Sequence, residues 1–247
     1  MDRMLFLAMN GASQIMQAQA TAANNLANVS TTGFKEDLAQ FRSMPVFGLG
    51  MPSRVYAMTE RPGVDLSAGA HNQTGRELDM AISGNGWFAV QGTDGNEAYT
   101  RAGDLHISSA GLLVNGAGHP IIGSSGAPIA IPPYEKIEIG ADGTITIRPI
   151  GQQANVLAQV DRIKLVNPDP ANLTKGADGL IHTKDGSVAP ADASVQVVSG
   201  VLENSNVNAV DEMVRIIELA RQYETQVKMM NAAKENETSS DRLIQMA

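Results

Sequence analysis

The stretch that decides the fold covers residues 4–34 and reads MLFLAMNGASQIMQAQATAANNLANVSTTGF. It contains no Asp, Glu, Lys or Arg. A helix in water normally keeps a charged face, and a membrane helix would not tolerate so many Gln and Asn residues. An uncharged yet polar helix is therefore predicted to be enclosed by other helices, which favours a role in assembly over catalysis.

Apolar or small side chains recur along this stretch at the three- and four-residue spacing of a helix. We expect the helix to stop at Gly33, a residue suited to a left-handed C-terminal turn. Because Ala buries little surface, packing against neighbours must supply most of the stability of this helix. The predicted assembly residues are Leu5, Ala8, Met9, Ala12, Ile15, Met16, Ala22, Ala23 and Leu26.

A second amphipathic helix is predicted at the C-terminus. Asn208 is a plausible N-cap, Asp211 and Glu212 follow it where the helix dipole favours acids, and the pattern continues to Ile244. The predicted assembly residues here are Met213, Ile216, Ile217, Ala220, Tyr223, Val227 and Met230. By pattern alone, an ordinary pair of core helices fits equally well; the position of both helices at the chain ends favours assembly.

The middle of the chain changes to short β-type runs separated by tight turns. The predicted strands are residues 79–83, 87–91, 112–114, 137–139, 144–147 and 162–166. Hairpin signals are Asn85–Gly86, Asp94–Gly95, Asn115–Gly116, Asp142–Gly143 and Asp185–Gly186.

These patterns predict an α+β protein, in which the two terminal helices pair as a coiled coil and the middle of the chain forms a mostly antiparallel β domain. The predicted parts are an assembly helix with its signature over residues 1–36, an extended connector over 37–73, the β domain over 74–200 and an assembly helix over 201–247. Within the connector, residues 54–58 could form a strand.

Composition excludes several classes of function. The 247 residues carry a net charge of −8, which argues against a nucleic-acid binder. No cysteine is present, and no window of about 18 apolar residues predicts a membrane span. We expect no cofactor, no metal and no catalytic residue: His71, His106, His119 and His182 are isolated. Asp79 and Asp104 could form a carboxylate pair, although solvated turn acids are the better interpretation.

Three segments carry a resemblance to a known family. They are ANNLANVSTTGFK (residues 23–35), ELDMAISGNGWFAV with YTRAGDL (77–90 and 99–105), and VLENSNVNAVDEM with RQYE (201–213 and 221–224). Together they resemble the bacterial flagellar axial proteins, which include the rod, hook and hook-associated proteins. The first segment resembles the family's N-terminal signature, whose residues here are Asn24, Asn25, Leu26, Ala27, Asn28, Ser30, Thr31, Gly33 and Phe34.

The resemblance, strongest to the proximal-rod members, implies a structural subunit of the flagellar basal body and no enzyme. It implies polymerisation through the terminal helices with itself, other proximal-rod subunits and the distal-rod protein. It also implies export through the flagellar type III apparatus without a cleaved signal peptide, into a rod that spans the periplasm. The alternatives are a distal-rod or hook-like subunit and, from another class, a cell-wall-acting enzyme of the periplasm.

Overall fold

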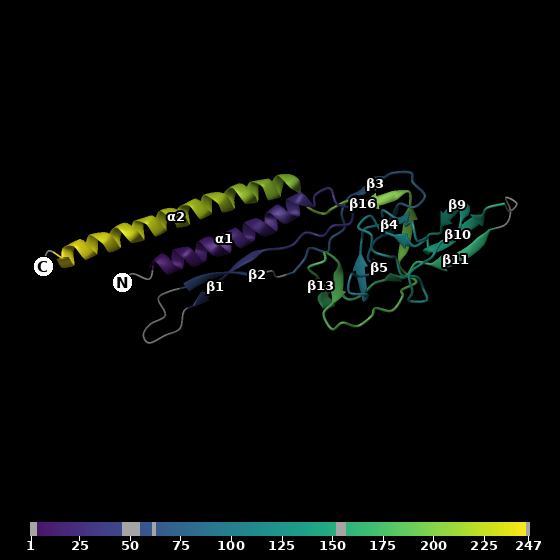
Figure 1. Cartoon of the computed structure of the whole chain (residues 1–247), viewed down its shortest axis with the longest axis horizontal. Coiled ribbons are helices and arrows are strands. Elements are labelled where there is room, and N and C mark those ends of the chain that lie inside the picture. The colour runs from purple at the N-terminus through teal and green to yellow at the C-terminus, as the bar shows by residue number, and fades with distance from the viewer. Residues whose placement is uncertain (1–3, 46–54, 61–62, 152–156, 246–247) are drawn as a thin grey trace. The chain divides into compact units, whose positions relative to one another are not determined.

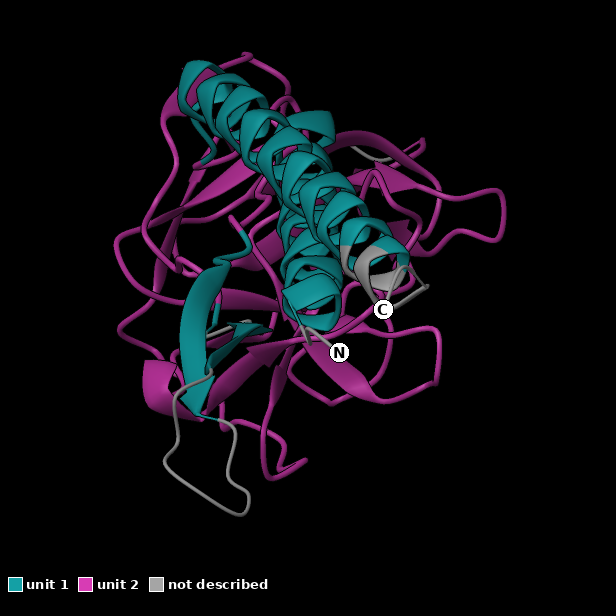
Figure 2. Ribbon diagram, turned by 90° about the vertical axis from the view of Figure 1, so that its left-hand side faces the viewer, with its two compact units in different colours: residues 1–28, 37–63, 207–247 teal, residues 29–36, 64–206 magenta. Residues whose placement is uncertain are grey.

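The computed structural model describes residues 4–45, 55–60, 63–151 and 157–245. The chain forms two compact units, coloured separately in Figure 2. Unit 1 comprises residues 1–28, 37–63 and 207–247, and unit 2 comprises residues 29–36 and 64–206. The four-part division expected from the sequence places its boundaries elsewhere and stays a prediction.

Unit 1 contains the two terminal helices, α1 (Met4–Ala27) and α2 (Ala209–Gln245), which run side by side (Figure 1). It also contains an antiparallel pair of strands, β1 (Gln40–Pro45) and β2 (Val55–Glu60), of which β2 contacts α1. The pair lies in the predicted connector, where residues 54–58 were expected to be extended; Arg54 is outside the described residues. β1 was not predicted, because its polar residues and its terminal Pro45 hide the strand alternation.

Both helix ends can be compared with the sequence. The expected stop at Gly33 is wrong, because α1 ends at Ala27, where Asn28 N donates to the carbonyl oxygens of Asn24 and Asn25 at 3.2 and 3.1 Å. The expected N-cap of α2 is confirmed, since Asn208 Oδ1 accepts a hydrogen bond from Val210 N at 3.1 Å. The expected extension of α2 through Ile244 is also confirmed.

Unit 2 is built from short antiparallel strands and one 3₁₀ turn, η1 (Pro170–Asn172). Its largest sheet has the order β12-β5-β6-β14-β13, and a three-stranded sheet has the order β11-β10-β9. Three strand pairs complete it: β15 with β4, β16 with β3 and β7 with β8. The strands are β3 (His71–Gln73), β4 (Met80–Ser83), β5 (Trp87–Gln91), β6 (Glu97–Thr100), β7 (His106–Ile107), β8 (Leu113–Val114), β9 (Tyr134–Ile139), β10 (Thr144–Pro149), β11 (Ala158–Arg162), β12 (Leu165–Val166), β13 (Leu173–Lys175), β14 (Ile181–Thr183), β15 (Gln196–Ser199) and β16 (Val201–Glu203).

A continuous apolar core holds unit 2 together. Phe88, Leu113 and Ile145 are fully buried in it, and further Ile, Leu and Val side chains from most of the strands surround them. The alternating burial along β10 is typical of a strand with one face on a core. The predicted α+β class, with paired terminal helices and a central antiparallel β region, is confirmed.

The turn signals had mixed outcomes. Asp94–Gly95 joins β5 to β6 and Asp142–Gly143 joins β9 to β10, so both are hairpin turns as predicted. Asn85–Gly86 is not a hairpin turn, because β4 and β5 pair with other strands and belong to different sheets. The strand predicted over residues 162–166 is divided between the end of β11 and β12. The backbone amides of residues 163 and 164 instead donate hydrogen bonds to residues outside these two strands.

Candidate functional site

One row of predicted assembly residues on α1 is buried within unit 1. Its members are Ala8, Ala12, Ile15 and Ala22. Ile15 and Ala22 pack with Leu219 of α2 in one apolar cluster. A Cβ added to Gly11 would lie 3.1 Å from Cδ of Gln226, so the side chain of this α2 residue packs directly over Gly11. This row therefore holds the two helices of one chain together.

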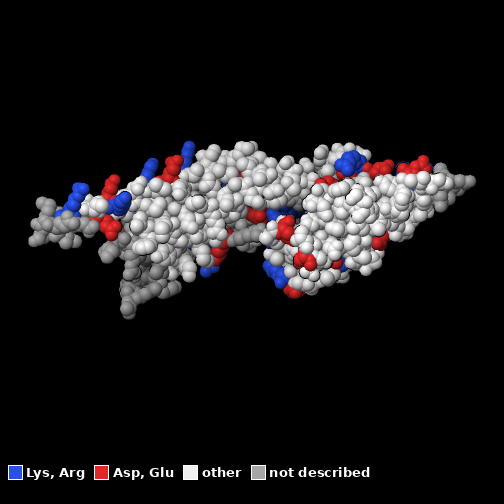
Figure 3. Space-filling model, in the orientation of Figure 1, with Lys and Arg blue, Asp and Glu red and all other residues white. Residues whose placement is uncertain are grey.

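The other predicted residues of α1 lie away from this core: Leu5, Met9, Met16 and Ala23 are exposed and Leu26 is half-buried. Met9 and Met16 are 54% and 56% exposed, and Phe6, which the sequence pattern did not single out, is 57% exposed. We call Phe6, Met9 and Met16 the exposed α1 row. In Figure 3 the charged atoms of unit 1 lie along α2 and the strand pair, and the surface over α1 is uncharged.

The predicted residues of α2 also divide into two groups. Met213 and Ile217 are exposed, whereas Ile216, Ala220, Tyr223, Val227 and Met230 are half-buried. Val210 and Val214 were missed, although they stand at helical spacing from Met213 and Ile217 and are exposed. The first turns of α2 thus carry a second exposed apolar strip, next to the charged remainder of the helix.

The uncharged polar residues of α1 bind a strand of their own chain. Asn10 Nδ2 donates to Ala57 O at 2.8 Å. Gln14 Oε1 accepts from Thr59 N at 2.6 Å, and Thr59 Oγ1 donates to Gln14 O at 3.0 Å. These polar side chains therefore complete the backbone hydrogen bonds of β2, a role that did not follow from the sequence pattern.

The family signature closes the end of α1. Asn25 is fully buried, and its side chain donates to Asp37 O and accepts from Asp37 N, both at 3.0 Å. This pair of bonds joins the last turn of α1 to the point where the chain re-enters unit 1. Of the other signature residues in this region, Asn24, Ala27, Ser30 and Thr31 are exposed, and Leu26 and Asn28 are half-buried.

The last two signature residues, Gly33 and Phe34, form their hydrogen bonds within unit 2. Gly33 has φ +67°, and a Cβ there would lie 2.3 Å from both Ala102 N and Arg101 C, so a side chain has no room. Gly33 N donates to Glu203 O at 2.7 Å. Asn206 N donates to Phe34 O at 3.3 Å. The N-terminal and C-terminal signatures are therefore hydrogen-bonded to each other inside the β unit.

A buried charge cluster lies at this junction. Glu203 is 0% exposed, and its carboxylate accepts from Lys35 Nζ at 2.6 Å, Arg101 Nη1 at 2.9 Å and Gly69 N at 3.0 Å. Lys35 Nζ also donates to Ser67 O at 2.6 Å. Hence the Glu203 carboxylate, the one acid of the cluster, holds two cations and one backbone amide.

The cluster shifts the ionisation of its members. Burial lowers the pKa of Lys35, against the opposing effect of its hydrogen bond to Glu203. Burial alone would raise the pKa of Glu203, but the hydrogen bond from Lys35 and the charge of Arg101 outweigh it and hold that pKa below its usual value. Glu203 is therefore held as a carboxylate saturated with donors, an arrangement suited to a structural role.

Aromatic rings cover the cations of this region. The Arg101 guanidinium carbon lies 5.3 Å from the centre of the Trp87 ring, and Lys175 Nζ lies 3.8 Å from the centre of the Phe34 ring. Lys175 Nζ also donates to Lys35 O at 2.8 Å. The signature residue Phe34 thus packs against a buried lysine of β13, a contact that no local sequence pattern could reveal.

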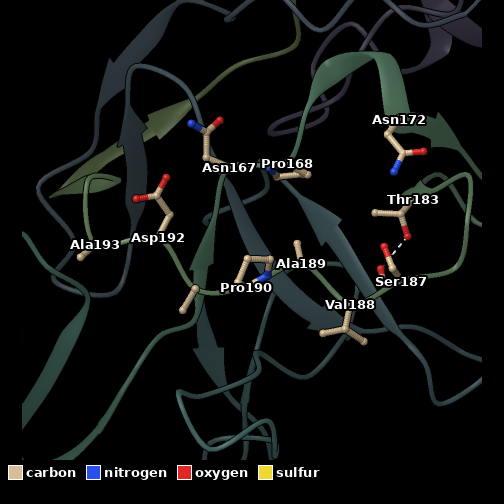
Figure 4. A pocket seen from close by; sticks show the side chains of 11 residues that line it. Asn167, Pro168, Asn172, Thr183, Ser187, Val188, Ala189, Pro190, Asp192 and Ala193 are labelled. Carbon is tan, nitrogen blue, oxygen red and sulfur yellow. Dashed lines mark hydrogen bonds between the residues drawn. The ribbon is translucent and has the colours of Figure 1, made fainter.

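A hollow in unit 2 gives no sign of hydrolytic chemistry. It has a volume of about 330 Å³, and Figure 4 shows the side chains that line it, including Asn167, Asn172, Thr183 and Asp192. Asp192 is the one carboxylate among its lining residues, and Oδ1 of Asp192 accepts hydrogen bonds from N and Oγ of Ser194. A paired general acid and base, as a glycan-cleaving enzyme requires, is therefore missing from this hollow.

The other sequence candidates for chemistry do not assemble into a site. Asp79 and Asp104 face each other across an isolated antiparallel bridge, and the expectation of a solvated acid is wrong for Asp79, which is buried. Asp79 accepts from Thr74 Oγ1 at 2.6 Å and lies 3.5 Å from Arg76, so its carboxylate is engaged within the fold. Among the described residues, no group of three or more His, Cys, Asp or Glu side chains could hold a metal ion. No described helix is long and apolar enough to cross a membrane.

Comparison with known proteins places these features in one family. Three family models match: "Flagella basal body rod protein" over residues 5–35, "Flagellar hook protein FlgE/F/G D1 domain" over 81–147 and "Flagellar basal body rod FlgEFG protein C-terminal" over 198–243. The flagellar basal-body rod proteins FlgF of Escherichia coli K12 and Salmonella typhimurium LT2 are 41% and 40% identical to this chain, with 100% of each chain covered.

A more distant relative carries a different subunit name. The flagellar basal-body rod protein FlgG of Bacillus subtilis 168 is 29% identical over 99% of this chain and 97% of its own length. The two FlgF relatives are matched over their whole length, and each shares a higher sequence identity with this chain than this FlgG does. The buried signature junction, the paired terminal helices and these matches agree: the chain belongs to the flagellar basal-body rod protein family, whose members are structural and not enzymes, and it is similar to the FlgF subunits of the proximal rod.

Proposed function

We propose that this rod subunit polymerises through its terminal helices to form part of the tubular drive shaft of the flagellum. The observation that carries the proposal is the exposed α1 row on a helix without any charge. Burying such a surface against neighbouring subunits desolvates no charged group. Each large apolar side chain of the row gains on the order of 1 kcal/mol when its exposed half is covered.

The partners we propose are further copies of this chain, the other proximal-rod subunits and the distal-rod protein. Family membership supports assembly with rod subunits in general, and the identity of each neighbour is part of the proposal. We also propose export through the flagellar type III apparatus without a cleaved signal, to a rod that spans the periplasm. The absence of cysteine fits this route, because no disulfide would oppose the passage of an unfolded chain.

The experiment introduces a charge into the exposed α1 row. In the bacterium that supplies this chain, Met16→Asp should remove the subunit from purified basal bodies and abolish swimming, since the carboxylate would be buried without a partner. The matched control is Gln222→Asp, which adds the same charge at an exposed position of α2. Both purified proteins should keep the helix content of the wild type by circular dichroism. Normal basal bodies containing Met16→Asp would refute assembly through this surface.

A further inference from the structure

A small hollow lies within unit 1 between α1, α2 and β1. Its volume is about 110 Å³. Its floor is Ala18, Ala22 and Leu219, which are all buried, and its rim includes Thr21 and Phe41. We call it the α1–β1 hollow. An apolar floor of small side chains leaves room for one inserted group and offers few bonding partners to water.

The polar groups at the rim are already engaged. Thr21 Oγ1 donates to Gln17 O at 3.3 Å, and Arg215 Nη1 lies 3.2 Å from Glu212 Oε1. Both groups therefore have a partner within their own chain. This hollow is smaller than an apolar cavity of about 150 Å³ that takes up benzene, so it suits the end of a single methionine side chain rather than a whole aromatic ring. The occupant that fits is an apolar knob on a surface without charge.

The exposed α1 row supplies such knobs, but on the opposite side of the helix. Met9 and Ala18 are nine residues apart, which at about 100° per residue places them about 180° apart around α1. A subunit therefore cannot fill its own hollow with this row. A two-fold contact cannot do so either, because it would need the knob and the hollow in the same surface patch.

We propose that a side chain of the exposed α1 row of one copy enters the α1–β1 hollow of the next copy, a heterologous contact that repeats from subunit to subunit. This inference rests on the proposed function and names the neighbour at that surface. The charge pattern supports a second copy as the occupant: α1 carries no charge over its described length, so it can lie over this rim without burying an unpaired charge. Repetition of a heterologous contact generates a ring or an open helix, as a rod wall requires.

The absence of cysteine in the chain makes the contact directly testable. Two tagged copies are expressed together in the source bacterium, one with Phe41→Cys at the rim and the other with Met9→Cys or Met16→Cys. Purified basal bodies are treated with a short bismaleimide. We expect a cross-linked mixed dimer from at least one of the two pairs, and none from any single variant alone.

A matched pair of variants then tests the hollow itself. Thr21→Phe, added to the Phe41→Cys copy, fills the hollow from its own rim and should lower the yield of mixed dimer about tenfold. Thr21→Ala leaves the hollow open and should preserve the yield. Because Thr21 is only half-buried, we expect both variants to keep their helices, and circular dichroism of the purified proteins checks this. An equal yield with Thr21→Phe would overturn the role of the hollow.

Two further outcomes would overturn the inference. Cross-linked dimers of Met9→Cys or Met16→Cys alone, without the mixed species, would show that the row packs face to face. Basal bodies that contain both copies but yield no mixed dimer would show that another chain occupies the hollow. In each of these results the subunit is still in the rod, so the proposed function stands. Absence of the wild-type chain from purified basal bodies would instead refute the proposed function.

Discussion

Lys35 Nζ lies 2.6 Å from Glu203 Oε1, and the two residues are 168 positions apart in the chain. Both side chains are almost fully buried, and Arg101 pairs with the second carboxylate oxygen. The bond joins the N-terminal signature to the C-terminal signature inside unit 2. The signatures therefore do more than flank the assembly helices, because they build the part of the fold from which both helices emerge.

Neutralising Glu203 should destabilise unit 2 strongly. In Glu203→Gln, Lys35 and Arg101 remain buried without their counter-charge, which costs about 3–5 kcal/mol of the free energy of unfolding. Urea unfolding followed by the fluorescence of Trp87, the one tryptophan of the chain, measures this loss. The control is Glu138→Gln, which removes an exposed pair with Lys136 and should leave the urea midpoint nearly unchanged. Equal losses in the two variants would contradict a stabilising role for the cluster.

The same carboxylate should make unit 2 sensitive to acid. The pKa of Glu203 is held below its usual value of 4.5, so the folded state binds its proton less readily than the unfolded state. Its contribution is complete above the unfolded pKa and is lost as pH falls through the folded pKa. The stability difference between wild type and Glu203→Gln should therefore be constant from neutral pH down to about pH 5.5 and shrink below about pH 4.5. A difference that stays constant down to pH 3 would show that folding does not lower the pKa of Glu203.

Gly33 should tolerate no side chain, because a Cβ would clash with neighbouring backbone atoms. This steric cost is separate from the penalty for the positive φ of the residue. Gly33→Ala places a Cβ 2.3 Å from backbone atoms of Arg101 and Ala102, which cannot move aside cheaply. Gly118 also has a positive φ, of 88°, but a Cβ there would meet nothing within 4 Å. Gly118→Ala should therefore cost only the left-handed backbone penalty of about 1–2 kcal/mol.

The measurement for Gly33 is the urea midpoint monitored by Trp87 fluorescence. Gly33→Ala should lose several times more stability than Gly118→Ala, because the clash adds to the same backbone penalty. If the two variants unfold at the same midpoint, the close approach of Gly33 to residues 101 and 102 does not exist in solution.

Much of the fold followed from local pattern. The strand predicted over residues 87–91 coincides with β5, and the Asn208 cap marks the start of α2, because each depends on neighbours within a few residues. Which apolar row of α1 packs inside the chain could not be decided, since both rows have helical spacing. A physical signal was present in the small residues around Gly11: small side chains leave room for those of α2, such as Gln226, whereas Met9 and Met16 of the other row are large.

The buried charge cluster lay beyond any local pattern. A lone lysine at position 35 or glutamate at position 203 is normally solvated, and only the three-dimensional fold brings them together. The polar side chains of α1 were likewise expected to contact helices of neighbouring subunits, whereas those of Asn10 and Gln14 form hydrogen bonds with the backbone of β2 in the same chain. β2 follows Gln14 by 41 residues or more, so the residue spacing along α1 could not indicate a contact with β2.

Asn25 should stabilise the last turn of α1 more than any other side chain of that turn. In Asn25→Ala, the two 3.0 Å hydrogen bonds with the backbone of Asp37 are lost at a buried position, which should cost about 2–4 kcal/mol. The adjacent control Asn24→Ala removes an exposed side chain from the same turn and should change stability by less than about 0.5 kcal/mol.

Hydrogen exchange of the backbone amides locates the effect of Asn25. In Asn25→Ala, protection should fall first in the last turns of α1 and at Asp37, because the bonds that join these two segments are gone. Protection of β5 and β6 should persist, since their core in unit 2 does not include Asn25. If amides throughout both units lost protection together, the chain would unfold as one cooperative body. The hydrogen bonds of Asn25 would then not stabilise the end of α1 locally.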